Sequence, residues 1–217
     1  MPARVKICGL NTADSLAAAL SARADLVGFV FFPPSPRHLS IDEARPLADY
    51  ARGQAAIVAL TVDPDNALLQ EIVDGVNPDM IQLHGSETPE RVAEVRATFA
   101  KPVMKAIKVA SAADAAVARA YKDVADLILF DARAPAGSTL PGGNGEAFDW
   151  RHLEGVRDEV AFMLSGGLTI QNVGEAISVT GATVVDVSSG VEEAPGVKSA
   201  ALIRAFMAAA KAPAPSS

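Results

Sequence analysis

The stretch from residue 161 to residue 192 contains one pattern twice, AFMLSGGLT at residues 161–169 and TVVDVSSGVE at residues 183–192. Each copy is a short run of mainly apolar and β-branched residues, followed by serine and glycine. Such a run indicates a buried strand, and the glycines indicate a loop whose backbone N–H groups can approach a ligand closely. The pattern therefore predicts two strands with ligand-binding loops at their carboxyl ends.

Similar runs occur at fairly even intervals along the whole chain. Together they make about eight candidate strands, at residues 5–8, 26–31, 57–62, 80–84, 103–107, 127–131, 161–164 and 183–187. The mean spacing of roughly 27 residues per strand lies at the compact end of what a β/α barrel requires. A parallel barrel is therefore one candidate architecture.

The segments between these runs follow the helical period. Their apolar residues recur as at Ala44, Leu47, Ala48 and Ala51, or at Val92, Val95 and Phe99. Ser40 with Glu43 forms a capping box, and Thr88 precedes Pro89 at a first helical position. The chain thus alternates strand and helix.

This alternation favours an α/β single-domain (β/α)8 TIM barrel over a doubly wound open sheet. An open sheet usually has fewer strands and a glycine-rich turn after the first one, whereas the first strand here continues as Cys8-Gly9-Leu10-Asn11. We expect residues 1–211 to form one catalytic domain. The Ala- and Pro-rich tail at residues 212–217 is expected to be disordered.

The composition excludes several classes of function. The chain has 217 residues, half of them hydrophobic, a net charge of -7 and a pI near 5.0, which argues against nucleic-acid or anionic-membrane binding. Cys8 is the single cysteine, so no intrachain disulfide or cysteine-rich zinc site can form. With no signal peptide in view, we expect a cytoplasmic protein.

Strand parity places several polar side chains inside the barrel. Because alternate residues face opposite sides of a strand, the inward set is Lys6, Cys8, Gln82, His84, Asp131 and Asp186. Branched apolar residues normally fill such an interior, so this set indicates a functional site. Each residue alone also has a simpler interpretation: Cys8 as a small buried hydrophobe and His84 as a structural hydrogen-bonding residue. The cation of Lys6 is expected to stabilise a Cys8 thiolate.

The two glycine-rich loops predict a phosphate site. Gly166, Gly167, Ser189 and Gly190 follow the seventh and eighth strands, where β/α barrels recurrently bind phosphate through backbone N–H groups and a helix N-terminus. The alternative is a pair of ordinary glycine turns. Given the acidic net charge, we expect these loops to bind a small phosphorylated molecule without lysine or arginine.

Taken together, the sequence resembles the phosphoribosylanthranilate isomerase family of tryptophan biosynthesis along nearly its whole length. The segments that carry the resemblance are KICGL (6–10), GFVF (28–31), SPR (35–37), QLHG (82–85), LFD (129–131), GGNG (142–145), FDW (148–150), LSGGL (164–168) and DVSSGVE (186–192). Each segment is short, but their combination in this order is specific.

The resemblance implies an Amadori rearrangement of phosphoribosylanthranilate to carboxyphenylamino-deoxyribulose phosphate, with Cys8 as general base and Asp131 as general acid. An unperturbed Asp has a pKa of about 3.9, so Asp131 would need an environment that keeps it protonated. Arg37 matches the residue that pairs with the anthranilate carboxylate, although a solvated loop arginine is the simpler interpretation.

The remaining site residues implied by the resemblance are His84 and Asp186 for substrate and Gly143 for phosphate. Members of this family usually have threonine at the position of Asn144, in the glycine-rich segment at residues 142–145. We expect this difference to bear on the contact between that loop and the substrate. The reaction needs no metal, nicotinamide or flavin, so we expect no cofactor. The expected ligand is a phosphosugar, and the chain is expected to be a monomer or homodimer.

Two rival functions remain open from the sequence. One is another phosphosugar barrel, such as indole-glycerol-phosphate synthase or a metal-dependent pentose-phosphate epimerase. Only three histidines are present, which poorly supports a metal-dependent epimerase. The other is an inactive barrel that binds a phosphorylated metabolite, which the presence of both Cys8 and Asp131 disfavours.

Overall fold

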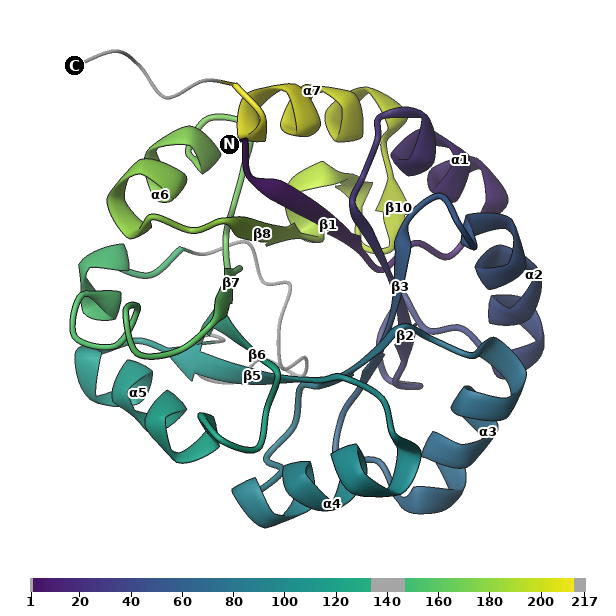
Figure 1. The fold of residues 1–217 in the computed structure, drawn as a ribbon. Helices are drawn as coiled ribbons and strands as arrows, with labels where there is room; N and C mark the ends of the chain where they lie inside the picture. The colour runs from purple at the N-terminus through teal and green to yellow at the C-terminus, as the bar shows by residue number, and fades with distance from the viewer. Residues whose placement is uncertain (1, 134–146, 213–217) are drawn as a thin grey trace.

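The computed structural model describes residues 2–133 and 147–212, and its centre is a closed parallel barrel (Figure 1). The strands are β1 (Arg4–Cys8), β2 (Leu26–Phe31), β3 (Ala56–Thr61), β4 (Met80–Leu83), β5 (Val103–Val109), β6 (Leu127–Ala132), β7 (Phe162–Leu164) and β8 (Val184–Val187). Each strand pairs with the next in the sequence, and β1 pairs with β8 to close the ring. The barrel is confirmed, and all the predicted strands lie within two residues of their expected bounds.

Helices surround the barrel. They are α1 (Ala13–Ser21), α2 (Ile41–Ala51), α3 (Asn66–Val76), α4 (Pro89–Phe99), α5 (Ala112–Ala116), α6 (Val173–Thr180) and α7 (Ala200–Ala210), with 3-10 turns η1 (Val117–Tyr121), η2 (Trp150–Leu153) and η3 (Ser189–Val191). The capping box of Ser40 and Glu43 and the Thr88 cap before Pro89 are both confirmed. In the described part of the chain, no helix is long and apolar enough to cross a membrane.

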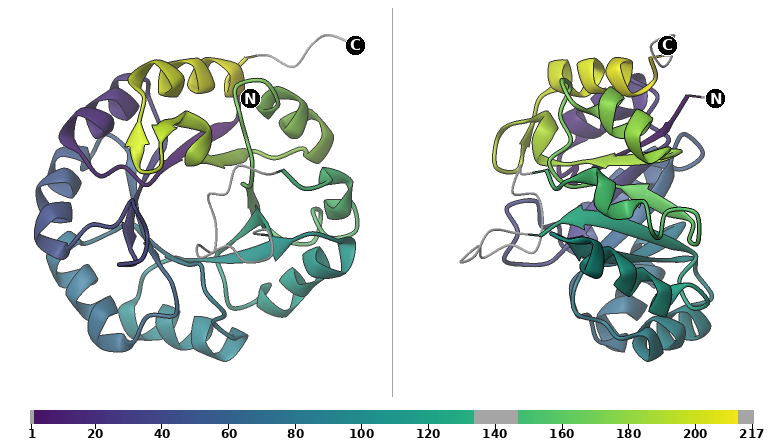
Figure 2. Two further views of the ribbon diagram at one scale, coloured as in Figure 1. Left: turned by 180° about the vertical axis from the view of Figure 1, so that it is seen from behind. Right: turned by 90° about the vertical axis from the view of Figure 1, so that its left-hand side faces the viewer.

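One element that the sequence did not predict follows β8. A short antiparallel hairpin, β9 (Glu192–Ala194) and β10 (Val197–Lys198), lies between η3 and α7. Gly196 in its turn has a φ of 82°, a left-handed conformation that favours glycine. The side view of Figure 2 places this hairpin at the end of the barrel toward which the parallel strands run.

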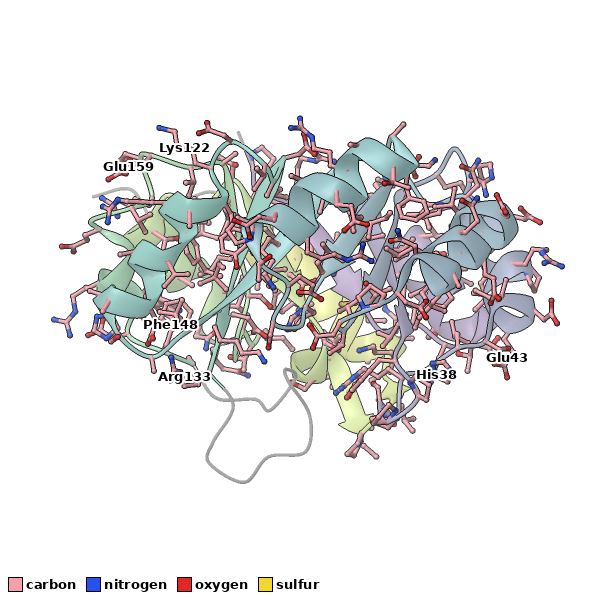
Figure 3. The ribbon with its side chains drawn as sticks, turned by 90° about the horizontal axis from the view of Figure 1, so that it is seen from below. His38, Glu43, Lys122, Arg133, Phe148 and Glu159 are labelled. Atoms are coloured by element: carbon pink, nitrogen blue, oxygen red, sulfur yellow. The ribbon has the colours of Figure 1, made fainter. Side chains whose placement is uncertain are left out.

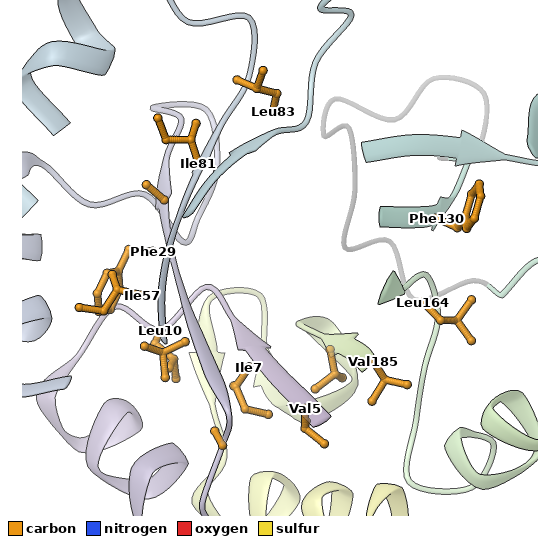
Figure 4. Close-up of a cluster of buried hydrophobic side chains, with 14 of the residues drawn as sticks. Val5, Ile7, Leu10, Phe29, Ile57, Ile81, Leu83, Phe130, Leu164 and Val185 are labelled. Carbon is orange, nitrogen blue, oxygen red and sulfur yellow. The ribbon is translucent and has the colours of Figure 1, made fainter. Parts of the chain in front are cut away.

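Alternate side chains of each strand face two different environments, as the alternation along the strands predicted. Toward the helices they form a continuous apolar layer, shown in Figure 4, with Val5, Ile7, Ile81, Phe130, Leu164 and Val185 among its fully buried members. Inside the barrel, a separate apolar cluster consists of Leu26, Val58, Met104, Ala106, Leu129 and Met163. The polar inward residues continue this interior toward the carboxyl ends of the strands.

The opposite rim, where the strands begin, is closed by carboxylates. The side chain that precedes each of β2, β4 and β6 accepts a backbone N–H near the start of the strand before it: Val5–Asp25 (2.9 Å), Ile57–Asp79 (2.7 Å) and Val103–Asp126 (2.9 Å). These bonds satisfy donors that the strand ladder leaves free.

Candidate active site

Cys8 lies at the end of β1 and is almost completely buried. Its exposed fraction is 4%, and a side-chain carbon built at Gly28 on the neighbouring β2 would come within 3.0 Å of the Cys8 Sγ. Glycine at this position therefore leaves room for the Cys8 thiol and for the end of the Lys6 side chain.

The expected thiolate stabilisation of Cys8 is wrong in its net direction. Burial raises the pKa of Cys8 and is the largest influence, while the Lys6 cation lowers it by a smaller amount. The pKa of the thiol thus lies above its ordinary value. Lys6 does oppose the effect of burial, as predicted, but its charge is shared with another partner.

That partner is Asp186. Lys6 Nζ lies 2.9 Å from Asp186 Oδ1, and the Ser165 hydroxyl donates to Asp186 Oδ2 over 3.0 Å. Although burial alone would lower it, the charges of Asp186 and Cys8 leave the pKa of Lys6 well above its ordinary range. Asp186 is thus brought into the site as predicted. In this structure its two carboxylate oxygens orient Lys6 and Ser165.

Asp131 ends a short relay on the opposite wall. Gln82 Nε2 lies 2.9 Å from His84 Nδ1, and His84 Nε2 lies 3.1 Å from Asp131 Oδ2, so the three side chains form one hydrogen-bonded line whose proton positions depend on the His84 tautomer. The backbone N–H of Ala132 donates to Asp131 Oδ1 over 3.0 Å. All three relay side chains are buried, and the relay holds the Asp131 carboxyl in one orientation. His84 therefore has a structural partner within the site.

The loop that carries His84 is supported by charges that the sequence analysis missed. Lys105 Nζ donates to Glu87 Oε2 over 2.6 Å and to the Gly85 carbonyl over 2.8 Å. Burial favours a higher pKa for Glu87, but Lys105 and several hydrogen bonds outweigh it and the net shift is downward. The available signal was Lys105 itself, a lysine at a helix-facing position of a buried strand.

Arg37 is buried and paired. Its Nε and Nη2 donate to the two carboxylate oxygens of Glu192, each over 2.8 Å, and its exposed fraction is 6%. Gly9, just after β1, has a φ of 77°, and a side-chain carbon there would lie 2.5 Å from Arg37 Cδ, so glycine is favoured where the arginine side chain packs against this loop. The simpler interpretation of Arg37 as a solvated loop residue is wrong.

Lys198 completes this group of charges, and neither it nor Glu192 was predicted as a site residue. Its ammonium lies 2.7 Å from Glu192 Oε1, the oxygen that also accepts the Arg37 Nε. We refer to Arg37, Glu192 and Lys198 as the mouth cluster. The missed signal was a glutamate and a lysine flanking a Pro-Gly turn, which brings them to one side of a hairpin.

The glycine loops after β7 and β8 contact each other. A side-chain carbon at Gly190 would lie 2.1 Å from the Leu168 carbonyl oxygen, so only glycine permits this approach. Gly166 and Gly167 have φ values of 86° and 63°. The two loops therefore form one surface, as a shared anion site requires.

The helix N-termini differ in part from expectation. The 3-10 turn η3 begins at Ser189, but α6 begins only at Val173, after Asn172 has bonded Thr169 N and the Gly167 carbonyl. Gly143 and Asn144 lie outside the described residues. No group of three His, Cys, Asp or Glu residues suited to a metal occurs within the described ranges.

Comparisons with known proteins agree on one family. The family model described as N-(5'phosphoribosyl)anthranilate (PRA) isomerase matches residues 5–209. A relative from Rhodopseudomonas palustris (strain BisB18), named N-(5'-phosphoribosyl)anthranilate isomerase, is 58% identical over 212 residues, covering 98% of this chain and 97% of the relative.

Solved structures give the same picture. Phosphoribosyl anthranilate isomerase from Thermotoga maritima superposes with a TM-score of 0.88 at 34% identity, covering 96% of this chain and 98% of that one. A phosphoribosyl anthranilate isomerase solved with reduced 1-(o-carboxyphenylamino)-1-deoxyribulose 5-phosphate has a TM-score of 0.85 at 32% identity and the same coverage.

Proposed function

Because this chain belongs to the N-(5'-phosphoribosyl)anthranilate isomerase family, we propose that Cys8 is its general base and Asp131 its general acid. The chain is an isomerase of tryptophan biosynthesis, which converts N-(5-phosphoribosyl)anthranilate to 1-(2-carboxyphenylamino)-1-deoxyribulose 5-phosphate. The family match also decides against indole-glycerol-phosphate synthase and a pentose-phosphate epimerase.

The observation that carries the acid and base assignment is their placement on β1 and β6. These strands are separated by β7 and β8 in the closed ring, so a sugar at the mouth has one group on each side. Asp131 donates a proton to the furanose ring oxygen, and the C1–O bond breaks to leave an iminium. The Cys8 thiolate removes the proton from C2 to give an enolamine, which takes up a proton at C1 and loses its C2 hydroxyl proton to become the ketone.

The free enzyme must supply a thiolate despite burial of the thiol. Its raised pKa means that only a fraction of Cys8 is ionised near neutral pH, and the reactive fraction grows as the pH rises. A thiolate of high pKa is also a stronger base than one of low pKa, which suits abstraction of a carbon-bound proton.

Side chains at the barrel mouth other than the acid and the base are proposed to bind the substrate. Arg37 is the proposed partner of the anthranilate carboxylate, held in place by its bidentate bond to Glu192. His84 and Asp186 remain predicted substrate-binding residues, each with a second task of orienting Asp131 or Lys6.

The phosphate is assigned to backbone N–H groups of the joined loops at Gly166, Gly167, Ser189 and Gly190. The contact between Gly190 and Leu168 supports this assignment. The state of monomer or homodimer stays a prediction.

A direct assay tests the function. Purified protein is mixed with freshly made phosphoribosylanthranilate, and loss of the substrate's fluorescence is followed with the Cys8→Ser variant as a matched control. We expect rapid loss with the wild type and little with the variant. Binding of the phosphosugar without turnover would instead identify an inactive, ligand-binding barrel.

A further inference from the structure

The β9–β10 hairpin packs against the mouth of the barrel. A side-chain carbon at Gly196 would lie 2.5 Å from the Pro36 carbonyl oxygen, so the turn abuts the loop that carries Arg37. Asn11 Nδ2 donates to the Gly196 carbonyl over 3.2 Å, which ties the same turn to the loop after β1. The hairpin therefore presents its residues to the Cys8 side of the site.

Lys198 is the most deeply buried charge on this hairpin. Its side chain is 0% exposed, and its three ammonium protons have three acceptors: Glu192 Oε1 (2.7 Å), the Ser188 carbonyl (3.0 Å) and Ser188 Oγ (3.1 Å). The Ser188 hydroxyl in turn donates to the Cys8 carbonyl over 3.1 Å. Lys198 is thus connected to the Cys8 backbone through one serine.

Several charged side chains surround the Cys8 thiol. Those that act on Cys8 are Lys6 from β1, Asp186 from β8, and Arg37 and Lys198 of the mouth cluster, whose third member Glu192 pairs with both of these cations. The pair of Lys6 and Asp186 is neutral, and so is Arg37 with Glu192 alone. Burial lowers the pKa of Lys198, and its pair with Glu192 opposes this shift; as an ammonium, Lys198 supplies the one net positive charge among these groups.

We propose that Lys198 is a positioning residue, whose charge favours the Cys8 thiolate and leaves Arg37 able to attract the substrate carboxylate. The proposal rests on the acid and base assignment above. Without Lys198, the bidentate pair of Arg37 and Glu192 presents a neutral surface to an anion. With Lys198 present, the mouth cluster keeps one net positive charge, even though Glu192 neutralises the charge of Arg37.

The contacts of Lys198 with Glu192 and Ser188 also allow a simpler role, in which Lys198 only holds the hairpin in place. The two functions differ in how the pKa of Cys8 responds to charge. A tether is lost when any member of the mouth cluster is changed. An electrostatic effect instead shifts the pKa of Cys8 in opposite directions when a positive or a negative charge is removed.

The test is a thiolate titration in the absence of substrate. Because Cys8 is the only cysteine, the ultraviolet absorbance of its thiolate is obtained by subtracting the Cys8→Ser protein at each pH. We expect Lys198→Gln to raise the pKa of Cys8 by about one unit or more, and Lys198→Arg to restore it. Glu192→Gln should lower the same pKa.

Lys122→Met provides a matched loss of one lysine charge. Lys122 is exposed and lies at the end of the molecule opposite the hairpin and His38 (Figure 3). This variant should leave both the pKa of Cys8 and the activity unchanged. Below that pKa, Lys198→Gln should also lower kcat/KM about tenfold, because one unit of pKa corresponds to that factor.

The proposal is overturned if the pKa of Cys8 is the same in Lys198→Gln as in the wild type, or if Glu192→Gln moves it in the same direction as Lys198→Gln. Should Lys198→Gln fail to fold, Glu192→Gln and Lys198→Arg still decide it. The titration needs no turnover, so it is independent of the proposed function. That function fails separately if Cys8→Ser remains active.

Discussion

The two rims of the barrel use carboxylates in opposite ways. Where the strands begin, Asp25, Asp79 and Asp126 accept backbone N–H groups of neighbouring strands, and Asp25 and Asp126 also pair with the partly exposed Lys211 and Arg96. Where the strands end, Asp186 and Glu192 bond side-chain cations, and Asp131 lies against His84. The first arrangement closes the fold, whereas the second keeps ionisable groups in fixed positions around a space for substrate.

This contrast has an energetic consequence. A carboxylate bonded to the backbone stabilises the folded chain and nothing else, so its removal should lower stability alone. A buried ion pair costs desolvation, and replacing such a pair by apolar residues is often neutral or stabilising. We therefore expect the strand-end rim to contribute function more than stability, as is general for this fold.

The largest expected effect is that of Cys8→Ser at the functional rim. A hydroxyl has a similar size but is a far poorer base, so turnover should fall by ~100-fold to 10,000-fold while folding and product affinity stay nearly intact. Steady-state kinetics and thermal melting measure the two effects. Near-normal turnover of the serine variant would remove Cys8 from the mechanism.

The pH profile sharpens the same prediction. Burial raises the pKa of Cys8, so the pH profile of its alkylation in the free enzyme should have a midpoint above the ordinary pKa of a thiol. This alkylation should inactivate the enzyme, and bound product should protect it. An alkylation midpoint below the ordinary value would contradict the raised pKa of the thiol.

Asp131→Asn should cost at least ~100-fold in turnover, because an amide cannot deliver a proton to the ring oxygen. Binding should change little, since His84 can still bond the amide oxygen. The wild-type pH profile should be bell-shaped, and the residual activity of the variant should lose the limb that belongs to Asp131. Persistence of both limbs would make Asp131 only a structural partner of His84.

Arg37→Met should act on binding rather than turnover. The loss of a charge-assisted pair with the substrate carboxylate should weaken binding by about 1.5 to 3 kcal/mol. Calorimetry with product and with an analogue that lacks the carboxylate measures this effect. If the substitution weakens both ligands equally, Arg37 does not recognise the carboxylate.

Asp79→Ala, at the opposite rim, is expected to have the smallest effect. It removes the acceptor for Ile57 N–H and should lower the free energy of unfolding by about 1 kcal/mol. Turnover should be unchanged, which urea unfolding and kinetics of the same preparation will measure. A large loss of activity would contradict the division of the molecule into a stabilising and a functional rim.

Much of the candidate site was predictable from the sequence because strand parity is local. Alternation along single strands sufficed to place Cys8, Gln82 and Asp186 inside the barrel, and short glycine segments predicted the two joined loops. The resemblance added the roles proposed for Cys8, Asp131 and Arg37, which no spacing argument supplies.

The partners of these residues were not predictable in the same way. Arg37 and Glu192 are 155 residues apart in the chain, and Lys6 and Asp186 are 180 apart, so no local periodicity connects them. The direction of the Cys8 pKa shift was also mispredicted, because it depends on how completely neighbouring strands exclude water.

The sequence by itself determined the closed barrel, the order of its strands and the set of inward polar residues, because hydrophobic periodicity and capping act over a few residues. Only the tertiary structure decided which charges pair, since closure of β1 against β8 brings the two ends of the chain together. It also decided that a hairpin carries Lys198 to the mouth. Burial there leaves the Cys8 thiol with a raised pKa, because the balance of charge and desolvation depends on three-dimensional contacts.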